Sequence, residues 1–256
     1  MSCEPHRSCV QPPDIEIPVW RFLSLAKFLD LLETGTLHFA RMDQFDDPYE
    51  GQPFGCYLNK IRYRTDLLAT LAAMRRRSRA TFYVNSWYLA DHEPAWAWKQ
   101  FLGGDLVVAV CSKYLDLMAA IESSQERCFL GLVQYAEPAE GRGLNAFDFA
   151  MAKRPNFDHE KEVRALLWRE AGLPIDEVER DNPTGIKVSV DLNLLLDSVI
   201  VSPTAPPWLR KTLEAVMSKL GVNQVPVIPS PLYDTPELAA YGGLFVNHNP
   251  LKGPSQ

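Results

Sequence analysis

The spacing of hydrophobic and polar residues along the chain predicts a mixture of helices and strands. Residues 24–33 place their apolar side chains on one helical face, between a Ser24 N-cap and a Gly35 C-cap. Residues 106–111 are wholly apolar, which is typical of a central strand. The same patterns predict further helices at 59–78, 91–101, 113–122 and 206–220, and further strands at 15–22, 37–41, 81–89, 128–135, 186–192, 198–202 and 225–228.

These elements predict a single domain of the α+β class, spanning residues 15–235, with a mixed or mostly antiparallel sheet and flanking helices. Strands and helices intermix without a regular βαβ rhythm, and no internal repeat divides the chain. Residues 1–14 lack periodicity and are expected to form a disordered tail, while residues 236–256 are expected to be an irregular tail. Pro18 places the first strand at a sheet edge or a bulge.

Composition narrows the class of protein. With 46% hydrophobic and 23% charged residues, the 256-residue chain has the make-up of an ordinary globular protein. The net charge of -6 gives no support for a dedicated nucleic-acid surface. No apolar run approaches the roughly 18 to 20 residues of a membrane span, and the N-terminus lacks the plan of a signal peptide. We therefore expect a cytoplasmic protein without a membrane partner.

Several common enzyme motifs are absent from the sequence. It contains no Gly-x-x-x-x-Gly-Lys-Ser/Thr phosphate loop, no Gly-x-Gly-x-x-Gly fingerprint and no Gly-x-Ser-x-Gly elbow. The five Cys residues include no Cys-x-x-Cys pair, which argues against a zinc ribbon. No resident cofactor and no metal site are firmly implied.

The stretch from residue 157 to 164 carries the densest pattern of charge, because Glu160, Glu162 and Arg164 alternate along it. In a strand these three side chains would share one face. In a helix, Glu160 and Arg164 would instead form an i,i+4 surface pair. Two neighbouring carboxylates need a cation, a shared proton or a polar ligand to offset their repulsion. The pattern therefore suits both an acid/base site and a plain ion-pair network.

Three other clusters each have a functional and a structural interpretation. The carboxylates of the 45–51 turn suit either a divalent cation or a capped turn; they are Asp46, Asp47 and Glu50. The basic run suits either phosphate groups or the end of a helix; it comprises Arg75, Arg76, Arg77 and Arg79. The tryptophans of the middle region suit either a flat ligand or the core; they are Trp87, Trp96 and Trp98.

A series of short motifs between residues 18 and 230 stands out as a set: residues 20–22, 32–39, 45–51, 86–87, 95–101, 153–154 and 157–164. Their order and spacing resemble those of a bacterial family, the domain-of-unknown-function family numbered twenty-nine seventy-one. That family brings no established activity to this chain.

Arg21, Ser86 and the Glu160-Lys161-Glu162 triplet follow one another in an order that supports a second resemblance. One branch of the ADP-ribosyltransferases uses an Arg on an early strand, a Ser on a middle strand and a Glu-x-Glu on a later strand. The opening strand and helix, with a Leu-x-x-Gly-x-Leu turn, are also similar. The chain departs from that pattern where Ser-Thr-Ser is replaced by Asn85-Ser86-Trp87, and in the long interval of residues 87–159.

This second resemblance implies that NAD is a substrate rather than a resident cofactor. Glu162 would then stabilise positive charge on the ribose, and Glu160 would orient or deprotonate an acceptor. Arg21 would clamp a phosphate or ribose oxygen, and Ser86 would position Glu162. The ligand-binding set implied beside them is Trp87, Arg164 and Trp98.

Two other functions remain open from the residues. The first is a non-catalytic nucleotide- or protein-binding module, for example a sensor or adaptor in phage defence. The second is a metal-dependent hydrolase or nuclease, which requires several converging carboxylates; the candidates are Asp46, Asp47, Glu50, Glu160 and Glu162.

Overall fold

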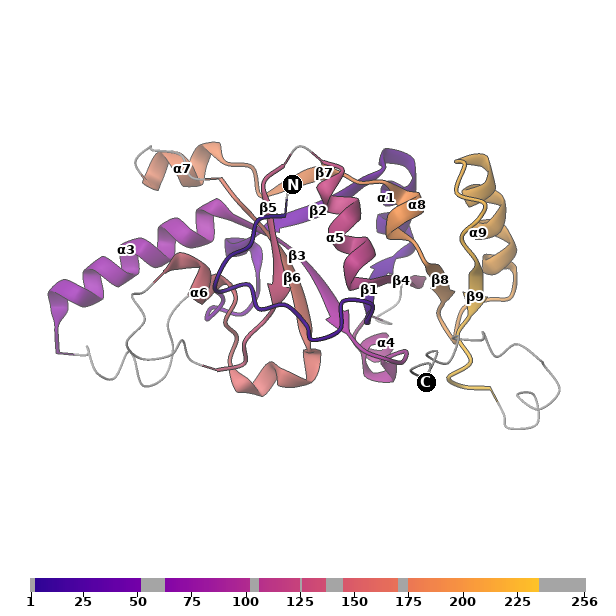
Figure 1. Ribbon diagram of the computed structural model, residues 1–256, viewed down its shortest axis with the longest axis horizontal. Coiled ribbons are helices and arrows are strands. Elements are labelled where there is room, and N and C mark those ends of the chain that lie inside the picture. The colour runs from indigo at the N-terminus through magenta and orange to yellow at the C-terminus, as the bar shows by residue number, and fades with distance from the viewer. Residues whose placement is uncertain are drawn as a thin grey trace, which may run out of the picture.

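The computed structural model describes residues 3–51, 63–101, 106–124, 126–136, 145–169 and 175–234 (Figure 1). Its helices are α1 (Leu25–Thr34), α3 (Thr65–Thr81), α4 (Ala95–Phe101), α5 (Tyr114–Glu122), α6 (Ala146–Ala150), α7 (Ile175–Asp181), α8 (Leu192–Leu195) and α9 (Trp208–Lys219). Two 3-10 turns are η1 (Met42–Gln44) and η2 (Pro155–Glu160). Its strands are β1 (Pro18–Ser24), β2 (Thr36–Arg41), β3 (Phe82–Leu89), β4 (Val107–Lys113), β5 (Cys128–Leu132), β6 (Glu162–Trp168), β7 (Gly185–Ser189), β8 (Ser198–Val201) and β9 (Val227–Pro229).

All these strands belong to one nine-stranded sheet, whose main path runs β5-β6-β3-β1-β4-β8-β9. Strand β2 pairs with β3 beside this path, and β7 pairs with β2. The pairings are antiparallel except for the parallel pair of β8 and β9. The predicted α+β class and the single domain with a mostly antiparallel sheet are confirmed.

The two faces of the sheet are covered in different ways. One face carries the large apolar core, which α1, α5, α8 and α9 cover (Figure 1). The other face carries two smaller apolar clusters, one beneath α6 and one beneath α4. Strand β3 shows the alternation: Tyr83 and Trp87 enter the large core, whereas Val84 and Tyr88 enter the two smaller clusters. Ser86 lies on the second face, between those two clusters.

Local signals in the sequence set several element ends as expected. The hydroxyl of Ser24 accepts a hydrogen bond from the Lys27 amide at 3.4 Å and caps α1. Gly35 ends α1 in a left-handed conformation, with φ 58°, which glycine adopts without steric cost.

Among the described helices, none is both long and apolar enough to cross a membrane.

The expected position of the first strand is wrong. Pro18 is the first residue of β1, where a missing amide hydrogen costs little, and β1 lies inside the sheet between β3 and β4. The helix expected at residues 113–122 is α5, which begins one residue later, because Lys113 still belongs to β4, and it begins without a side-chain cap.

The N-terminal segment differs from the disordered tail that its sequence predicts. Its backbone follows the outer edge of β5, with hydrogen bonds from Glu4 to the Cys128 carbonyl at 2.9 Å and from Leu132 to the Val10 carbonyl at 2.8 Å. Gly131 permits this approach, because a Cβ atom there would lie 2.7 Å from the backbone of Cys9. An exposed strand edge offers unpaired backbone groups, and this segment satisfies part of them. The predicted tail at residues 236–256 lies outside the described residues.

Strand β3 changes its neighbour partway along, and we call residues 85–87 the fork. Before the fork Val84 pairs with Ala40 of β2, and after it Tyr88 pairs with Trp20 of β1. On its other side β3 stays paired with β6 throughout, with Ser86 opposite Arg164. At the fork, the edge of β3 that faces β1 and β2 therefore has no strand partner, and a side chain can bond its backbone groups there.

Candidate functional site

Two side chains bridge the fork, one from β3 itself and one from β1. The amide of Asn85 donates to the carbonyl oxygen of His38 at 2.8 Å, which ties β3 to β2. The guanidinium of Arg21, on β1, donates to the carbonyl oxygen of Ser86 at 2.5 Å. The position of Arg21 is therefore set by a strand edge that the sheet itself leaves open.

The charged stretch at residues 157–164 is neither a continuous strand nor an α-helix. Glu160 ends the 3-10 turn η2, Lys161 adopts a left-handed conformation with φ 42°, and Glu162 begins β6. Glu160 and Glu162 therefore do not share a strand face by alternation. The turn at Lys161 nevertheless brings both carboxylates to the same ammonium group, because Lys153 Nζ lies 2.5 Å from Glu160 Oε2 and 3.5 Å from Glu162 Oε2.

Glu162 meets Ser86 across the pair of β6 and β3. The hydroxyl of Ser86 donates to Glu162 Oε1 at 2.5 Å, and Arg164 donates to both carboxylate oxygens, at 2.8 and 2.9 Å. Burial by itself would raise the pKa of Glu162. The charge and hydrogen bonds of Arg164, with help from Lys153 and Ser86, outweigh that effect and hold the pKa below its ordinary value. Glu162 is thus an ionised carboxylate in a buried position.

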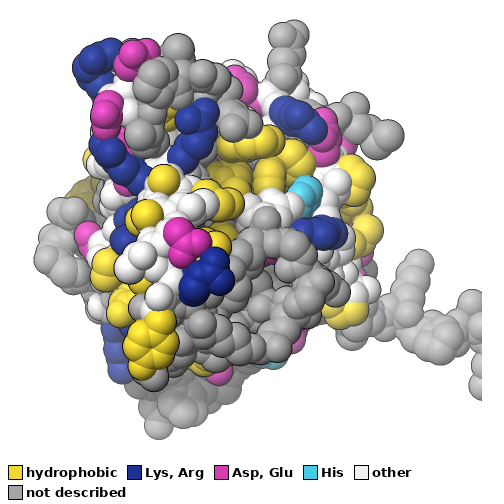
Figure 2. All heavy atoms as spheres, turned by 90° about the vertical axis from the view of Figure 1, so that its left-hand side faces the viewer, with side chains coloured by type: hydrophobic (Ala, Val, Ile, Leu, Met, Phe, Trp, Pro, Cys, Tyr) yellow, Lys and Arg dark blue, Asp and Glu magenta, His cyan; other side chains and the backbone are white. Residues whose placement is uncertain are grey.

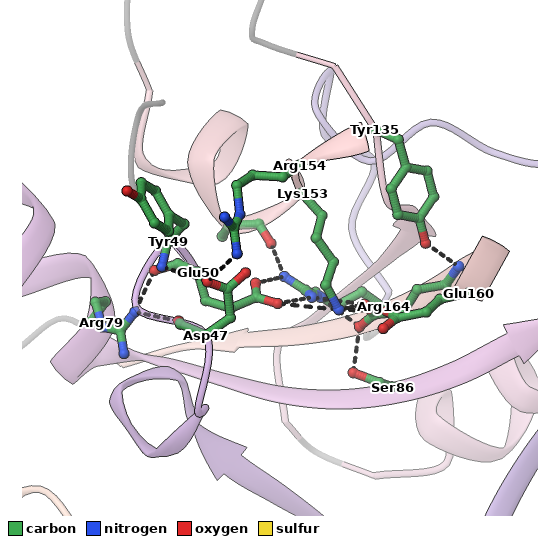
Figure 3. A network of polar contacts seen from close by, with 12 residues as sticks. Asp47, Tyr49, Glu50, Arg79, Ser86, Tyr135, Lys153, Arg154, Glu160 and Arg164 are labelled. Carbon is green, nitrogen blue, oxygen red and sulfur yellow. Dashed lines mark hydrogen bonds and ion pairs between the residues drawn. The ribbon is translucent and has the colours of Figure 1, made fainter. Parts of the chain in front are cut away.

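Arg164 lies at the centre of a buried network that holds Glu162, and Figure 3 shows it beside Glu50 and Lys153. Beyond its pair with Glu162, it donates to the carbonyl of Ala150 at 2.6 Å and to Glu50 at 3.1 and 3.5 Å. Lys153 also approaches Glu50, at 3.4 Å. Burial alone would lower the pKa of Arg164, but Glu162 and Glu50 raise it well above its ordinary value. Each N–H group of this guanidinium therefore has an acceptor within the protein.

Arg21 has a very different environment. Its one hydrogen bond within the described chain goes to the Ser86 carbonyl, and it forms no ion pair with a described carboxylate. Its guanidinium carbon lies 5.9 Å from the ring centre of Trp87. Burial lowers the pKa of Arg21 to about 10, although the nearby Tyr88 and Glu162 act in the opposite direction. A partly buried cation with no carboxylate partner among the described residues is a candidate binder of an anionic ligand group.

The structure does not support a ligand-binding role for Trp87, Trp98 and Arg164, the predicted ligand-binding set. Trp87 and Trp98 are fully buried, at 0% exposure, and their indole N–H groups donate to Asn85 at 2.7 Å and to Glu93 at 2.5 Å. Neither ring can stack on a ligand, because both faces are packed inside the protein. Arg164 is also buried and has no donor left for a ligand. These three residues support the site from within.

Two tyrosines of the site were missed by the sequence argument. Tyr88 lies opposite Glu162 in the β3–β6 ladder and packs edge-to-face on Trp96, which in turn contacts His159. Tyr135 accepts a hydrogen bond from the Glu162 amide at 2.7 Å. Burial, with the charges of Glu160 and Glu162, raises the pKa of Tyr88. Tyr88 follows Ser86 by two residues in β3, so the alternation of a strand places both side chains on one face. That spacing could have identified Tyr88 from the sequence.

The 45–51 turn binds cations, but they are protein side chains. Asp47 pairs with Arg154 at 3.0 Å, and Glu50 pairs with Arg164 and Lys153. Within the described part of the chain, no group of three or more His, Cys, Asp or Glu has the arrangement of a metal site. Where Glu50, Glu160 and Glu162 converge, basic side chains occupy the space between them.

The basic run on α3 is held largely by neighbouring protein groups. Arg76 pairs with Asp176 and Glu179 of α7, and Arg79 donates to the Glu50 carbonyl at 2.6 Å. Figure 2 shows basic and acidic side chains intermixed on the face from which α3 extends. This arrangement supports the structural interpretation of the run over the phosphate-binding one.

Comparisons with known proteins add little beyond this geometry. No family model matches the sequence, so the resemblance to the domain-of-unknown-function family is unconfirmed. No curated protein matches either. Among solved structures, the chain is similar to "Thermus sp. 2.9 DarT in complex with ADP-ribosylated ssDNA", with 10% sequence identity, a TM-score of 0.41, and coverage of 86% of this chain and 96% of that one. A similarity of this extent is too low to carry an argument about activity.

Proposed function

We propose that the site cleaves the bond between nicotinamide and ribose in NAD and transfers the ADP-ribose group to an acceptor. The observation that carries this proposal is a chain of contacts across adjacent strands, from Arg21 to the Ser86 backbone and from the Ser86 side chain to Glu162. Arg21 reaches the Ser86 carbonyl, and the Ser86 hydroxyl reaches Glu162, each at 2.5 Å. The three side chains lie in the order Arg, Ser and Glu that the sequence resemblance requires.

Glu162 supplies the charge that this reaction needs. When the bond from ribose C1′ to the nicotinamide nitrogen breaks, its electron pair neutralises the pyridinium, and positive charge develops on the ribose. A fixed carboxylate stabilises that cationic transition state more than the ground state. Ser86 and Arg164 occupy Glu162 Oε1 and one side of Oε2, while Lys153 lies at 3.5 Å, beyond an ordinary hydrogen bond. The remaining lone pair of Oε2 is the one assigned to the ribose.

The other residues of the site have roles that fit their exposure. The side chain of Glu160 is 14% exposed, against 5% for Glu162 and 4% for Glu50, so Glu160 is the carboxylate best placed to meet an acceptor. It would take the proton that the acceptor loses when its oxygen or nitrogen bonds to C1′. Arg21, lacking a described carboxylate partner, would bind a phosphate or ribose oxygen of NAD.

A non-catalytic nucleotide-binding module is the second candidate, and one observation favours it. Glu162 is only 4% exposed and forms a two-point ion pair with Arg164. Such a carboxylate can have a purely structural role. Arg21 and the partly exposed Tyr88 and Trp96 would then bind a ligand without changing it chemically. Turnover separates the two candidates.

The test is nicotinamide release from NAD by the purified protein, with a cell lysate as the source of acceptors. We expect release by the wild type and a loss of at least 100-fold in Glu162→Gln, since the charge at the ribose is removed. Glu33→Gln, at an exposed position on α1, is the matched control and should release nicotinamide at the wild-type rate.

Folding must be measured beside activity, because Glu162 is the buried partner of Arg164. Thermal unfolding of Glu162→Gln should leave the protein folded at the assay temperature. Absence of release by the wild type, with ADP-ribose still binding, would refute the transferase proposal and favour the binding module.

A further inference from the structure

The 45–51 turn carries a buried carboxylate that the proposed reaction does not use. Glu50 is only 4% exposed and follows β2 closely in the chain, far from Glu162 in sequence. Its backbone is fixed at both groups: its amide donates to the Asp47 carbonyl at 3.1 Å, and its carbonyl accepts from Arg79 at 2.6 Å. Because its backbone is held in this way, the Glu50 side chain can fix the position of the groups that it contacts.

Glu50 binds the edge of Arg164 that Glu162 leaves free. Arg164 presents Nε and one side of Nη2 to Glu162. It presents the other side of Nη2 to Glu50 and shares Nη1 between Glu50 and the Ala150 carbonyl (Figure 3). The guanidinium is planar, so an acceptor at each edge fixes its rotation as well as its position. Glu50 also approaches Lys153, the second cation beside Glu162, at 3.4 Å.

We propose that Glu50 is a positioning residue, which holds Arg164 and Lys153 in place and through them fixes the carboxylate of Glu162 against Ser86. This inference rests on the proposed role of Glu162 as the group that stabilises the ribose cation. Glu50 itself touches no substrate.

The charge balance of the network gives the proposal a measurable signature. Three carboxylates, Glu50, Glu160 and Glu162, share two cations, Lys153 and Arg164, so the group has one net negative charge. Loss of the Glu50 charge alone would lower the pKa of Glu162, whereas loosening of Arg164 and Lys153, which hold that pKa down, would raise it. A rise in the pKa of Glu162 on removal of Glu50 is therefore the signature of positioning.

The experiment compares Glu50→Gln with the wild type and with Asp46→Asn, a loss of a carboxylate at an exposed position of the same turn. In the nicotinamide-release assay, kcat should fall about 10- to 100-fold in Glu50→Gln while KM stays within about 3-fold, because positioning is lost and binding is kept. The acid limb of its pH–rate profile should move to higher pH, and a move to lower pH would show that only a charge was lost and that Glu50 does not position the two cations. Asp46→Asn should show neither effect.

A second measurement does not depend on activity. Hydrogen exchange of the Arg164 Nε–H, followed by NMR, should become at least 10-fold faster in Glu50→Gln, while backbone amides of the central strand β4 exchange as in the wild type. Unchanged Arg164 exchange would overturn the proposal. If the wild type releases no nicotinamide, the proposed function fails, and Arg164 exchange still decides whether Glu50 fixes this guanidinium.

Glu50→Asp covers the case in which Glu50→Gln does not fold. It keeps the charge but shortens the side chain by one methylene group, so it cannot hold both Arg164 and Lys153 as closely. The exchange rate of the Arg164 Nε–H in Glu50→Asp should be faster than in the wild type but by less than the 10-fold expected when the Glu50 contact is lost. Exchange identical to the wild type would show that Glu50 does not hold Arg164.

Discussion

Two arginines reach the fork of β3 from opposite sides, and they are paired very differently. Arg164, on β6, lies opposite Ser86 and donates to Glu162, Glu50 and a backbone carbonyl. Arg21, on β1, donates to the Ser86 carbonyl and forms no ion pair with a described carboxylate. Their pKa values shift in opposite directions, because carboxylates raise that of Arg164 and burial lowers that of Arg21.

This difference separates structural charge from available charge. A buried ion pair that is fully hydrogen-bonded is costly to break, because removing one member leaves the other charged and unpaired. A partly buried cation without a described carboxylate partner, such as Arg21, loses part of its hydration in the free protein, and a ligand anion can compensate for that loss. Under the proposed function, the paired side of the fork would hold the catalytic carboxylate, and the unpaired side would bind the substrate.

The largest expected effect comes from breaking the paired side. Arg164→Met should destabilise the protein by about 3–5 kcal/mol, because it leaves Glu162 and Glu50 buried without their shared cation. Urea unfolding monitored by Trp fluorescence measures the change. Arg169→Met is the control: its pair with Glu126 is solvent-exposed, so its loss should cost less than about 1 kcal/mol. Equal effects of the two substitutions would contradict the distinction.

The unpaired side should respond in the opposite sense. Arg21→Met should change the free energy of unfolding by less than about 1 kcal/mol, because it removes a partly buried charge together with the cost of its partial desolvation. Its affinity for ADP-ribose, measured by calorimetry, should fall roughly 10- to 100-fold, the value of one or two charge-assisted hydrogen bonds. Destabilisation as large as that of Arg164→Met would instead make Arg21 a structural residue.

The sequence predicts most elements of this fold because their signals are local. Alternation along β3, the apolar run of β4 and the Ser24 and Gly35 caps each lie within a few residues. Pro18 misled the argument, because the beginning of an inner strand tolerates proline as well as an edge does. The N-terminal segment was missed because the groups that order it, the edge of β5 and side chains such as Asp148 and Tyr114, lie far away in the sequence.

The candidate site was less accessible to sequence reasoning, because its contacts join distant segments. Glu50 meets Arg164 across 114 positions, and Ser86 meets Glu162 across 76. No periodicity links such residues, and only the resemblance placed Arg21, Ser86 and Glu162 in one group. Trp87 and Trp98 were assigned to a ligand because sequence alone does not give the exposure of an aromatic ring.

The paired side should also show itself in the pH dependence of stability. The pKa of Glu162 lies below its ordinary value in the folded protein, whereas the unfolded chain binds this proton near pH 4.3. The stability that Glu162 contributes is therefore fully present above about pH 4.3 and is lost as the pH falls through the folded pKa. The stability gap between wild type and Glu162→Gln should shrink over this acidic range, by about 1.4 kcal/mol for each unit of pKa shift. Urea unfolding between pH 3 and 7 checks it, and a constant gap would contradict a lowered pKa.

The smallest expected effect tests how the paired side holds its own backbone. Lys161 carries Glu160 and Glu162 on either side of a left-handed turn, at φ 42°, which costs a residue with a Cβ atom about 1 kcal/mol. At ordinary positions glycine is less stable than alanine by roughly 0.5–1 kcal/mol. At this position the order should reverse, with Lys161→Gly at least as stable as Lys161→Ala in urea unfolding. If alanine proves the more stable, the turn between the two carboxylates is not strained, and the network alone sets their approach.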